Sequence, residues 1–248
     1  MISKHKISDI RKLHQKKFRD AERLFLVEGW KSVEMLLASD FRVEELFATE
    51  EAYERNRRML ESVPVTLVTM AEMERISTLA TPPELMAVAC QASQSLMIPD
   101  NEPVLVLDRI ADPGNMGTII RTADWFGFRH IVCSTDCVEF YNPKTIQATM
   151  GSFAHLVPHY TDLVPFLRAQ ATRRRIIGAF LNGESLNTFK FQSSDIIVIG
   201  SESNGISPEV EQQVSQRITI PSPVSGRATA ESLNAAIAAA IIMCRFAQ

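Results

Sequence analysis

The sequence predicts an α/β protein with two domains, the larger of which contains a mainly parallel sheet. The chain has 248 residues, of which 46% are hydrophobic, so it is long enough to bury one large core or two smaller ones. From residue 104 onward, short apolar runs alternate with segments of helical period, as in a parallel sheet covered by helices on both faces. The stretch 91–103 contains two prolines and no clear period, and it predicts a linker between the domains.

The first domain, residues 1–95, is predicted to be a small α/β domain. Val33, Leu36 and Leu37 are spaced to share one face of a helix, and short apolar runs farther along the chain predict strands. The predicted elements are helices at 8–20 and 28–38 and strands at 43–48, 65–68 and 85–90.

The second domain, residues 103–248, is predicted to alternate strand and helix. The Ala-rich stretch near its end favours a closely packed helix. The predicted strands are 104–107, 130–134, 155–159, 175–180, 195–199 and 217–220, and the predicted helices are 116–126, 142–149, 161–171, 207–214 and 230–246.

Charge is unevenly distributed along the chain. Residues 1–23 contain eight Lys or Arg and three Asp or Glu, so this arm carries +5 while the remainder carries −8. A basic arm favours contact with nucleic acid phosphates, although a solvated helix face explains such a run equally well. The candidate phosphate contacts are Lys12, Lys16, Lys17 and Arg19, with Arg227 in the second domain.

Composition excludes several other classes. No apolar stretch approaches the roughly 20 residues of a membrane helix, and the first residues lack a signal-peptide core, so a cytoplasmic protein without membrane contact is expected. The four cysteines form no zinc or redox pattern, and the apolar helix around Cys244 predicts a buried thiol there. None of the five histidines falls in a ligand cluster, so no metal is predicted.

Three segments carry polar residues where a strand or loop leads into a helix. The first follows the strand 104–107 and contains Asn115 and Arg121, the second runs from Gly200 past Glu202, and the third holds Ser232 and Asn234. Ligands bind at such strand-to-helix turns in α/β folds. Taken singly, however, the first turn could be only a tight connection, Glu202 a solvated acid, and Ser232 a helix N-cap.

Together, and in this order, the three segments resemble the TrmH (SpoU) branch of the SPOUT superfamily, the RNA ribose 2′-O-methyltransferases that use S-adenosylmethionine. The resemblance is strong over residues 104–248. Residues 4–90 look more weakly like the small ribosomal-protein-like substrate-binding domain of that family. The matching residues are Asn115, Gly117 and Arg121, then Gly200, Glu202, Asn204 and Gly205, then Pro221, Glu231, Ser232, Leu233 and Asn234.

The resemblance implies a carboxyl-terminal domain with a deep trefoil knot, which is an exception to the rule that protein chains avoid knots. It also implies a homodimer in which each subunit supplies part of the other's active site. The knot would bind S-adenosylmethionine through Leu181, Gly200, Glu202, Ile220, Pro221 and Leu233.

By the same resemblance, the catalytic residues would be Asn115, Arg121, Glu202, Ser232 and Asn234. The reaction is attack of a ribose 2′-hydroxyl on a sulfonium methyl group, and this hydroxyl must lose its proton or have its developing charge stabilised. The family's arginine has been viewed as a base, but a guanidinium stays protonated in proteins, which favours charge stabilisation or phosphate anchoring. The role of Arg121 therefore stays open, and the 2′-hydroxyl favours RNA over DNA.

One departure from the family and two other classes bear on this interpretation. The loop between Pro221 and Ser232 is longer than expected and could alter the cofactor loop. A non-catalytic RNA-binding or ribosome-assembly protein could keep the fold and the basic arm, but would not need all five polar residues. A NAD-binding enzyme is disfavoured because no Gly-x-Gly-x-x-Gly turn occurs. The two-domain layout favours ribosomal RNA over transfer RNA as the substrate.

Overall fold

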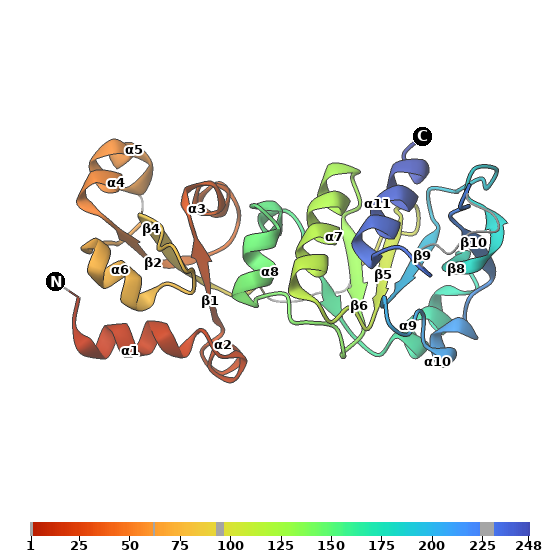
Figure 1. Ribbon diagram of the computed structural model, residues 1–248, viewed down its shortest axis with the longest axis horizontal. Coiled ribbons are helices and arrows are strands. Elements are labelled where there is room, and N and C mark those ends of the chain that lie inside the picture. Colours follow the sequence, from red (N-terminus) through yellow and green to blue (C-terminus); the bar gives the residue numbers. More distant parts are fainter. Residues whose placement is uncertain (1, 62, 93–96, 224–230) are drawn as a thin grey trace. The chain divides into compact units, whose positions relative to one another are not determined.

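The computed structural model describes residues 2–61, 63–92, 97–223 and 231–248. The chain divides into two compact units, Met1–Ser93 with Glu139–Ala154 and Gln94–Val138 with His155–Gln248. Residues 139–154, which the sequence pattern assigns to the second domain, therefore group with the amino-terminal unit (Figure 1).

The amino-terminal unit contains a four-stranded sheet in the order β1-β4-β2-β3. Strand β4 lies antiparallel to both β1 and β2, while β2 and β3 are parallel. The predicted strands β2, β3 and β4 are present, whereas β1 was missed because a short apolar run has no period that separates strand from helix. The strands are β1 (Leu24–Glu28), β2 (Val43–Ala48), β3 (Val65–Leu67) and β4 (Leu85–Cys90).

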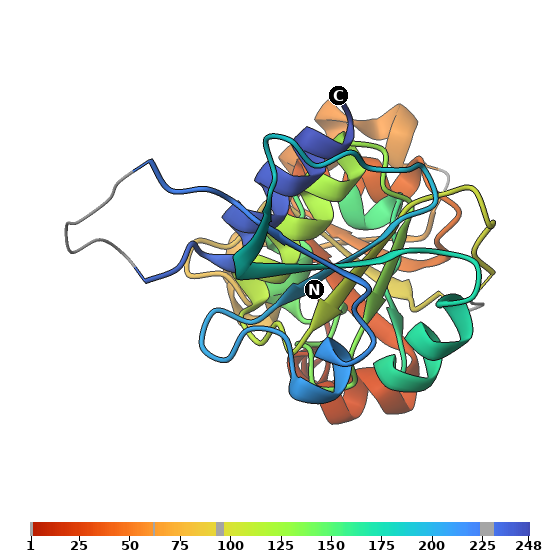
Figure 2. The same cartoon turned by 90° about the vertical axis from the view of Figure 1, so that its right-hand side faces the viewer.

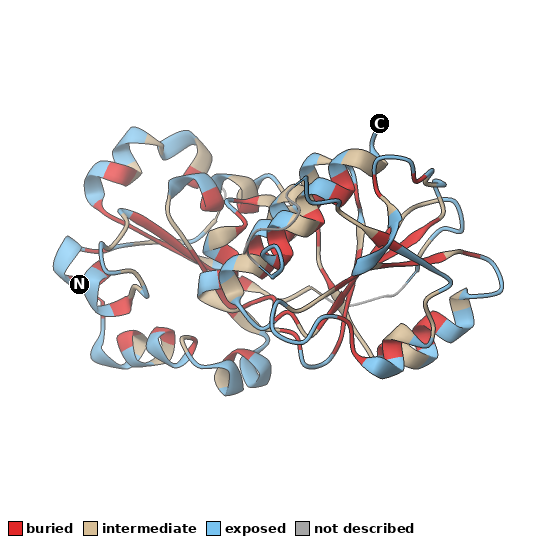
Figure 3. Ribbon diagram, turned by 45° about the vertical axis from the view of Figure 1, so that its right-hand side comes forward, coloured by how far each residue is buried: buried red, intermediate tan, exposed pale blue. Residues whose placement is uncertain are grey.

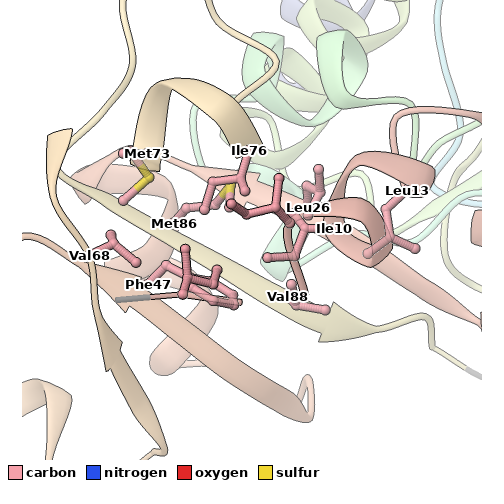
Figure 4. Packing of buried hydrophobic residues seen from close by; sticks show 11 residues of the cluster. Ile10, Leu13, Leu26, Phe47, Val68, Met73, Ile76, Met86 and Val88 are labelled. Carbon is pink, nitrogen blue, oxygen red and sulfur yellow. The ribbon is translucent and has the colours of Figure 1, made fainter. Parts of the chain in front are cut away.

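Helices cover both faces of this sheet. Alternate residues of a strand point to opposite sides, and the apolar side chains on each side are buried by the helices that cover it. On β1, Leu26 belongs to an apolar cluster with residues of α1 and α6 (Figure 4). The neighbouring Phe25 instead contacts Tyr141 at a ring-centroid distance of 4.7 Å. The predicted helix 8–20 is two helices, α1 and α2. The helices of the unit are α1 (Lys4–Lys12), α2 (Lys16–Glu22), α3 (Trp30–Leu37), α4 (Glu50–Arg55), α5 (Arg57–Leu60), α6 (Met70–Ile76), α8 (Pro143–Ala148) and the 3-10 turn η1 (Ser152–Ala154).

Arg19 on α2 is buried, with 2% of its surface exposed. Its Nε and Nη2 donate to the two carboxylate oxygens of Glu139 at 2.6 and 2.9 Å, and Nη1 donates to the Leu13 carbonyl at 2.7 Å. A buried guanidinium held by three such bonds is not available to RNA phosphates, so the prediction that Arg19 contacts RNA is wrong. Arg19 instead attaches segment 139–154 to the helices at the start of the chain.

Replacing Arg19 by alanine is expected to lower the free energy of unfolding by about 3 kcal/mol, because the Glu139 carboxylate would lose its partner in a poorly solvated position. The neighbouring exposed pair Lys16–Asp20 provides the control, since Lys16→Ala should cost about 0.5 kcal/mol or less. Urea unfolding of both variants measures the difference. Equal losses would show that burial of the Arg19 pair does not matter to stability.

The carboxyl-terminal unit contains a six-stranded sheet in the order β10-β8-β9-β5-β6-β7. Every pairing in it is parallel, as the alternating pattern predicts. The strands are β5 (Val104–Asp108), β6 (His130–Cys133), β7 (His159–Tyr160), β8 (Ile176–Ser185), β9 (Ile196–Gly200) and β10 (Gln216–Thr219).

Helices lie on both faces of this parallel sheet. α7 (Pro113–Trp125) and α11 (Ala235–Phe246) pack together on one face, and α9 (Leu163–Gln170) and α10 (Pro208–Glu211) pack on the other (Figure 2). The central strands are buried while the outer faces of the helices are exposed (Figure 3). Within the described residues, no helix is long and apolar enough to span a bilayer.

Several boundaries differ from prediction for local reasons. The predicted strand 155–159 overlaps the observed β7 only at His159, because β7 begins directly after Pro158, which lacks an N–H. Helix α11 begins after Asn234 rather than at 230, and α10 ends at Glu211 rather than 214. The prediction of a buried Cys244 is also wrong, because this residue lies on an exposed position of α11. The linker prediction 91–103 falls partly outside the described residues.

Candidate functional site

The candidate site lies where β5 and β9 end side by side in the carboxyl-terminal unit. The last residues of the two strands, Asp108 and Gly200, are in register. Asp108 is 2% exposed, and its Oδ2 accepts a hydrogen bond from the backbone N–H of Ser207 at 2.6 Å. This contact joins the end of β5 to the loop after β9. Sequence reasoning missed Asp108, although a carboxylate directly after an apolar strand is a usable signal.

The loop after β9 closes on itself in a way that requires glycine. Ser201 and Gly205 exchange two backbone hydrogen bonds, of 3.2 and 2.8 Å, and Gly205 has a φ of +63°. A Cβ at Gly200 would lie 2.1 Å from the carbonyl carbon of Gly205. This distance is too short for any side chain, so only glycine fits at position 200. The backbone of Gly200 therefore packs directly against the backbone of Gly205 and Ile206 at the end of the loop, while Glu202 within the loop is exposed.

Three polar side chains from separate segments form a hydrogen-bonded network at this edge. The Asn115 amide Nδ2 donates to Glu202 Oε1, and Asn234 Nδ2 donates to Asn115 Oδ1 at 3.0 Å. Glu202 Oε1 also accepts the backbone N–H of Ala235 at 3.2 Å. The structure thus brings together one residue from each of the three segments that the sequence singled out.

Helix capping explains why Asn115 and Asn234 are held in place. Asp112 caps α7 by accepting the backbone N–H of Asn115 at 2.7 Å, and Asn234 caps α11 by accepting the N–H groups of Ala236 and Ile237. The N-cap of α11 is therefore Asn234 rather than Ser232. Both helices direct their positive dipole ends at the Glu202 carboxylate, which stabilises negative charge at this place.

The other two predicted catalytic residues lie outside this network. Arg121 is an exposed residue of α7, six positions after Asn115 and therefore roughly 9 Å farther along the helix axis. It makes no hydrogen bond or ion pair with another described residue of the chain. Ser232 is exposed in the segment before α11 and likewise has no hydrogen-bond partner among the described residues.

The residues predicted to bind a cofactor come from three neighbouring strands and from the segment before α11. Leu181 lies in β8, Gly200 ends β9, and Ile220 and Pro221 directly follow β10. Leu181 and Leu233 are 77% and 46% exposed, which is unusual for leucines. Exposed apolar side chains and a close-packed glycine backbone fit an adenosyl group, which needs apolar walls and backbone contacts.

The predicted RNA-binding lysines are exposed, but each of them already contacts an acidic or aromatic side chain. Lys12 pairs with Asp9 at 2.8 Å, Lys16 pairs with Asp20, and the ammonium of Lys17 lies 4.7 Å from the Phe18 ring centroid. Such exposed pairs are weak and can exchange for phosphate contacts. Arg227 lies outside the described residues, within the loop between Pro221 and Ser232. No group of metal-ligating side chains occurs among the residues with described positions.

A parallel sheet with a polar network and glycine-dependent loop at its carboxyl edge defines an α/β protein with a ligand site at that edge. Residues 102–244 match the model of the SpoU rRNA Methylase family, and the chain belongs to this family. Residues 4–87 match the model of the MRM3-like substrate binding domain.

Relatives and solved structures span almost the whole chain. The chain is 30% identical over 246 residues to the 23S rRNA (guanosine(2553)-2'-O)-methyltransferase RlmP of Bacillus subtilis (strain 168), with 96% of this chain and 94% of the relative covered. The crystal structure of the AdoMet-bound rRNA methyltransferase from Sinorhizobium meliloti has a TM-score of 0.86 at 28% identity, covering 99% of this chain and 96% of that chain. A TrmH-family structure from Porphyromonas gingivalis has a TM-score of 0.86 at 36% identity, covering 99% and 98%.

Proposed function

We propose that this protein transfers a methyl group from S-adenosylmethionine to a ribose 2′-hydroxyl of ribosomal RNA. The observation that carries the proposal is the Asn115–Glu202–Asn234 network, which lies in the region that matches the SpoU rRNA Methylase family. Residues 103–248 perform the transfer, and residues 1–95 bind the RNA substrate. The match of residues 4–87 to a substrate-binding domain supports this division.

Bound S-adenosylmethionine supplies the electrophilic methyl group of its sulfonium. The polar network of this chain holds the acceptor ribose and receives its proton. Glu202 Oε1 is occupied by Asn115 and Ala235, which fixes the carboxylate and leaves Oε2 to accept a hydrogen bond from the 2′-hydroxyl. The hydroxyl proton would pass to Glu202 Oε2 and from there to water, which leaves the 2′-oxygen able to accept the methyl group. Ser232 and Asn234 complete the polar wall.

Arg121 supplies a permanent positive charge that stabilises the developing 2′-oxyanion or anchors the adjacent phosphate. A guanidinium stays charged in proteins, so this role agrees better with its chemistry than that of a base. Because Arg121 has no described partner in its own chain, we further propose that it acts in the active site of a second copy within a homodimer.

Exposed apolar residues on α7 and α11 support the homodimer. Trp125 is 84% exposed one turn after Arg121 on α7, and Ile237 and Ile241, 51% and 37% exposed, are one turn apart on α11. Apolar side chains on two packed helices are typical of a surface covered by another subunit. The double variant Ile237→Asp/Ile241→Asp should be monomeric in analytical ultracentrifugation, whereas Leu67→Asp on β3 should leave the state of association unchanged.

Mixing two inactive variants tests whether the site is shared. An Arg121→Ala subunit and a Glu202→Gln subunit would form a mixed dimer with one intact site, so activity should reappear on mixing. If both residues act within one chain, the mixture stays inactive.

The trefoil knot also belongs to this proposal and is supported by family membership. The knot would involve the segments around Leu181, Gly200 and Ile220, whose strands are neighbours in the sheet. The cytoplasmic location remains a proposal, supported by the ribosomal RNA named as substrate of the Bacillus relative.

Methyl-labelled S-adenosylmethionine and ribosomal RNA that lacks the protein's own modification provide the decisive test. Label should appear on a single ribose, found by mapping the methylated nucleotide. Cofactor binding without transfer to free ribosomal RNA, but with transfer to a ribosomal precursor particle, would identify the particle as the substrate. Absence of cofactor binding would contradict the proposal and favour the non-catalytic RNA-binding alternative.

A further inference from the structure

A small cavity with both apolar and polar walls lies in the amino-terminal unit and shares no residue with the polar network of the carboxyl-terminal unit. Its volume is about 190 Å³, below the roughly 300–1,000 Å³ of typical cofactor pockets, so it suits a single ring system rather than a whole nucleotide cofactor. The start of α3, the end of α4 and the start of β4 form its walls. The lining residues are Trp30, Ala52, Arg55, Asn56, Glu84 and Leu85.

Backbone hydrogen bonds hold these three walls together. The N–H of Gly29, directly before Trp30, donates to the Leu85 carbonyl at 3.0 Å, and the N–H of Thr49 donates to the Glu84 carbonyl at 2.9 Å. Thr49 also caps α4 through its side chain. The cavity is therefore preformed by secondary structure and does not depend on a loop that must close.

The side chains around the cavity supply one aromatic face and several hydrogen-bonding groups. The Trp30 indole is 37% exposed. Asn56 Nδ2 donates to the Ala52 carbonyl at 3.0 Å, which leaves its Oδ1 as an acceptor without a described partner. Arg55 Nη1 donates to Glu84 Oε2 at 3.1 Å, and both of these side chains are at least half exposed. An exposed pair of this kind contributes about 0–1 kcal/mol, so a ligand can separate it at little cost.

We infer that this cavity binds one unpaired base of the RNA substrate, stacked on Trp30, with guanine preferred. The inference rests on the proposed function, because it takes RNA as the substrate. Aromatic side chains stack on unpaired bases in single-stranded RNA, whose Watson–Crick edges are then read by hydrogen bonds. Guanine offers N–H donors to the Glu84 carboxylate and O6 and N7 acceptors to the Arg55 guanidinium, a complement that no other base provides.

Two cations beside the cavity suit the phosphates on either side of such a base. Lys31 directly follows Trp30 and Arg58 lies on α5, both are exposed, and neither forms an ion pair with a described residue. Arg57, by contrast, is already paired with Glu54 and Glu61. An RNA strand should therefore bind more tightly than a free guanine nucleotide, which has only one phosphate position to offer.

Tryptophan fluorescence tests the inference directly, because the chain has only two tryptophans, Trp30 and Trp125. In the full-length Trp125→Phe variant, the remaining indole reports on the cavity. Short unstructured oligoribonucleotides that contain guanine should quench it at lower concentrations than those that contain only adenine, cytosine or uracil. Guanosine monophosphate should quench more weakly than the guanine oligonucleotide. Equal affinity for the mononucleotide, or no quenching by any RNA, would overturn the inference.

Variants of the cavity extend the test to the reaction. Trp30→Ala should raise the KM for RNA about 5- to 150-fold, the loss expected for one stacked base, while kcat stays unchanged. Glu84→Gln should abolish the guanine preference without loss of fold, whereas the control Glu51→Gln on α4 should behave as wild type. An unchanged KM in Trp30→Ala would contradict the inference. Failure of the proposed function would appear differently, as absent methyl transfer with quenching of Trp30 retained.

Discussion

Replacing Arg121 by alanine is expected to lower the rate of methyl transfer about 10²- to 10³-fold, the usual effect of removing one charge-stabilising group from an active site. Arg121 is exposed and has no described partner, so cofactor affinity and the free energy of unfolding should stay near their wild-type values. Single-turnover assays with saturating RNA and labelled cofactor measure the rate of the chemical step.

Two further substitutions separate the possible roles of this arginine. Arg121→Lys keeps the charge but loses the planar fork, so partial activity would indicate charge stabilisation and not bidentate phosphate binding. Arg129→Ala removes another exposed arginine of the same unit and serves as the control. If Arg121→Ala kept full activity at saturating RNA, the catalytic role would be excluded.

Replacing Gly200 by alanine is expected to lower the free energy of unfolding by at least about 4 kcal/mol and to remove cofactor binding. The added Cβ would lie 2.1 Å from the Gly205 carbonyl carbon and 2.3 Å from the Ile206 nitrogen, and neither backbone atom can move without opening the loop. Thermal unfolding and cofactor titration measure the two effects.

Gly205 in the same loop provides the matched control. A Cβ there meets no atom within 4 Å, so alanine should cost only the roughly 1–2 kcal/mol of a left-handed conformation. Equal destabilisation by Gly200→Ala and Gly205→Ala would mean that conformational strain, and not the close backbone packing, dominates at both positions.

The parallel sheet was predictable because its strands are buried on both faces and are separated by clear helices. β5 and β9 lie within one residue of their predicted positions. β1 was missed and the helix 8–20 was wrongly continued across residues 13–15, since short apolar runs and charged helices carry little information about where they end. The grouping of residues 139–154 with the first unit was also not predictable, because it depends on contacts between segments more than 100 residues apart.

For the site, the order of polar residues along the chain identified Asn115, Glu202 and Asn234, but only the structure shows that they contact one another. The charge run at residues 1–23 led to the wrong interpretation of Arg19. Counting charges does not reveal which side chain turns inward, and the partner of Arg19 is 120 residues away. Pairings of this kind depend on the fold and leave no local signal.

The position of residues 139–154 determines when each unit can complete its fold during synthesis of the chain. Arg19 and Phe25 meet Glu139, Tyr141 and Phe153, so the first unit cannot complete its core when residue 93 emerges from the ribosome. The nascent chain must first continue through β5, α7 and β6, and the first unit is completed only after part of the second has been translated. Synthesis of the two units is thus interleaved, and a fragment ending near residue 95 would carry a buried arginine without its carboxylate.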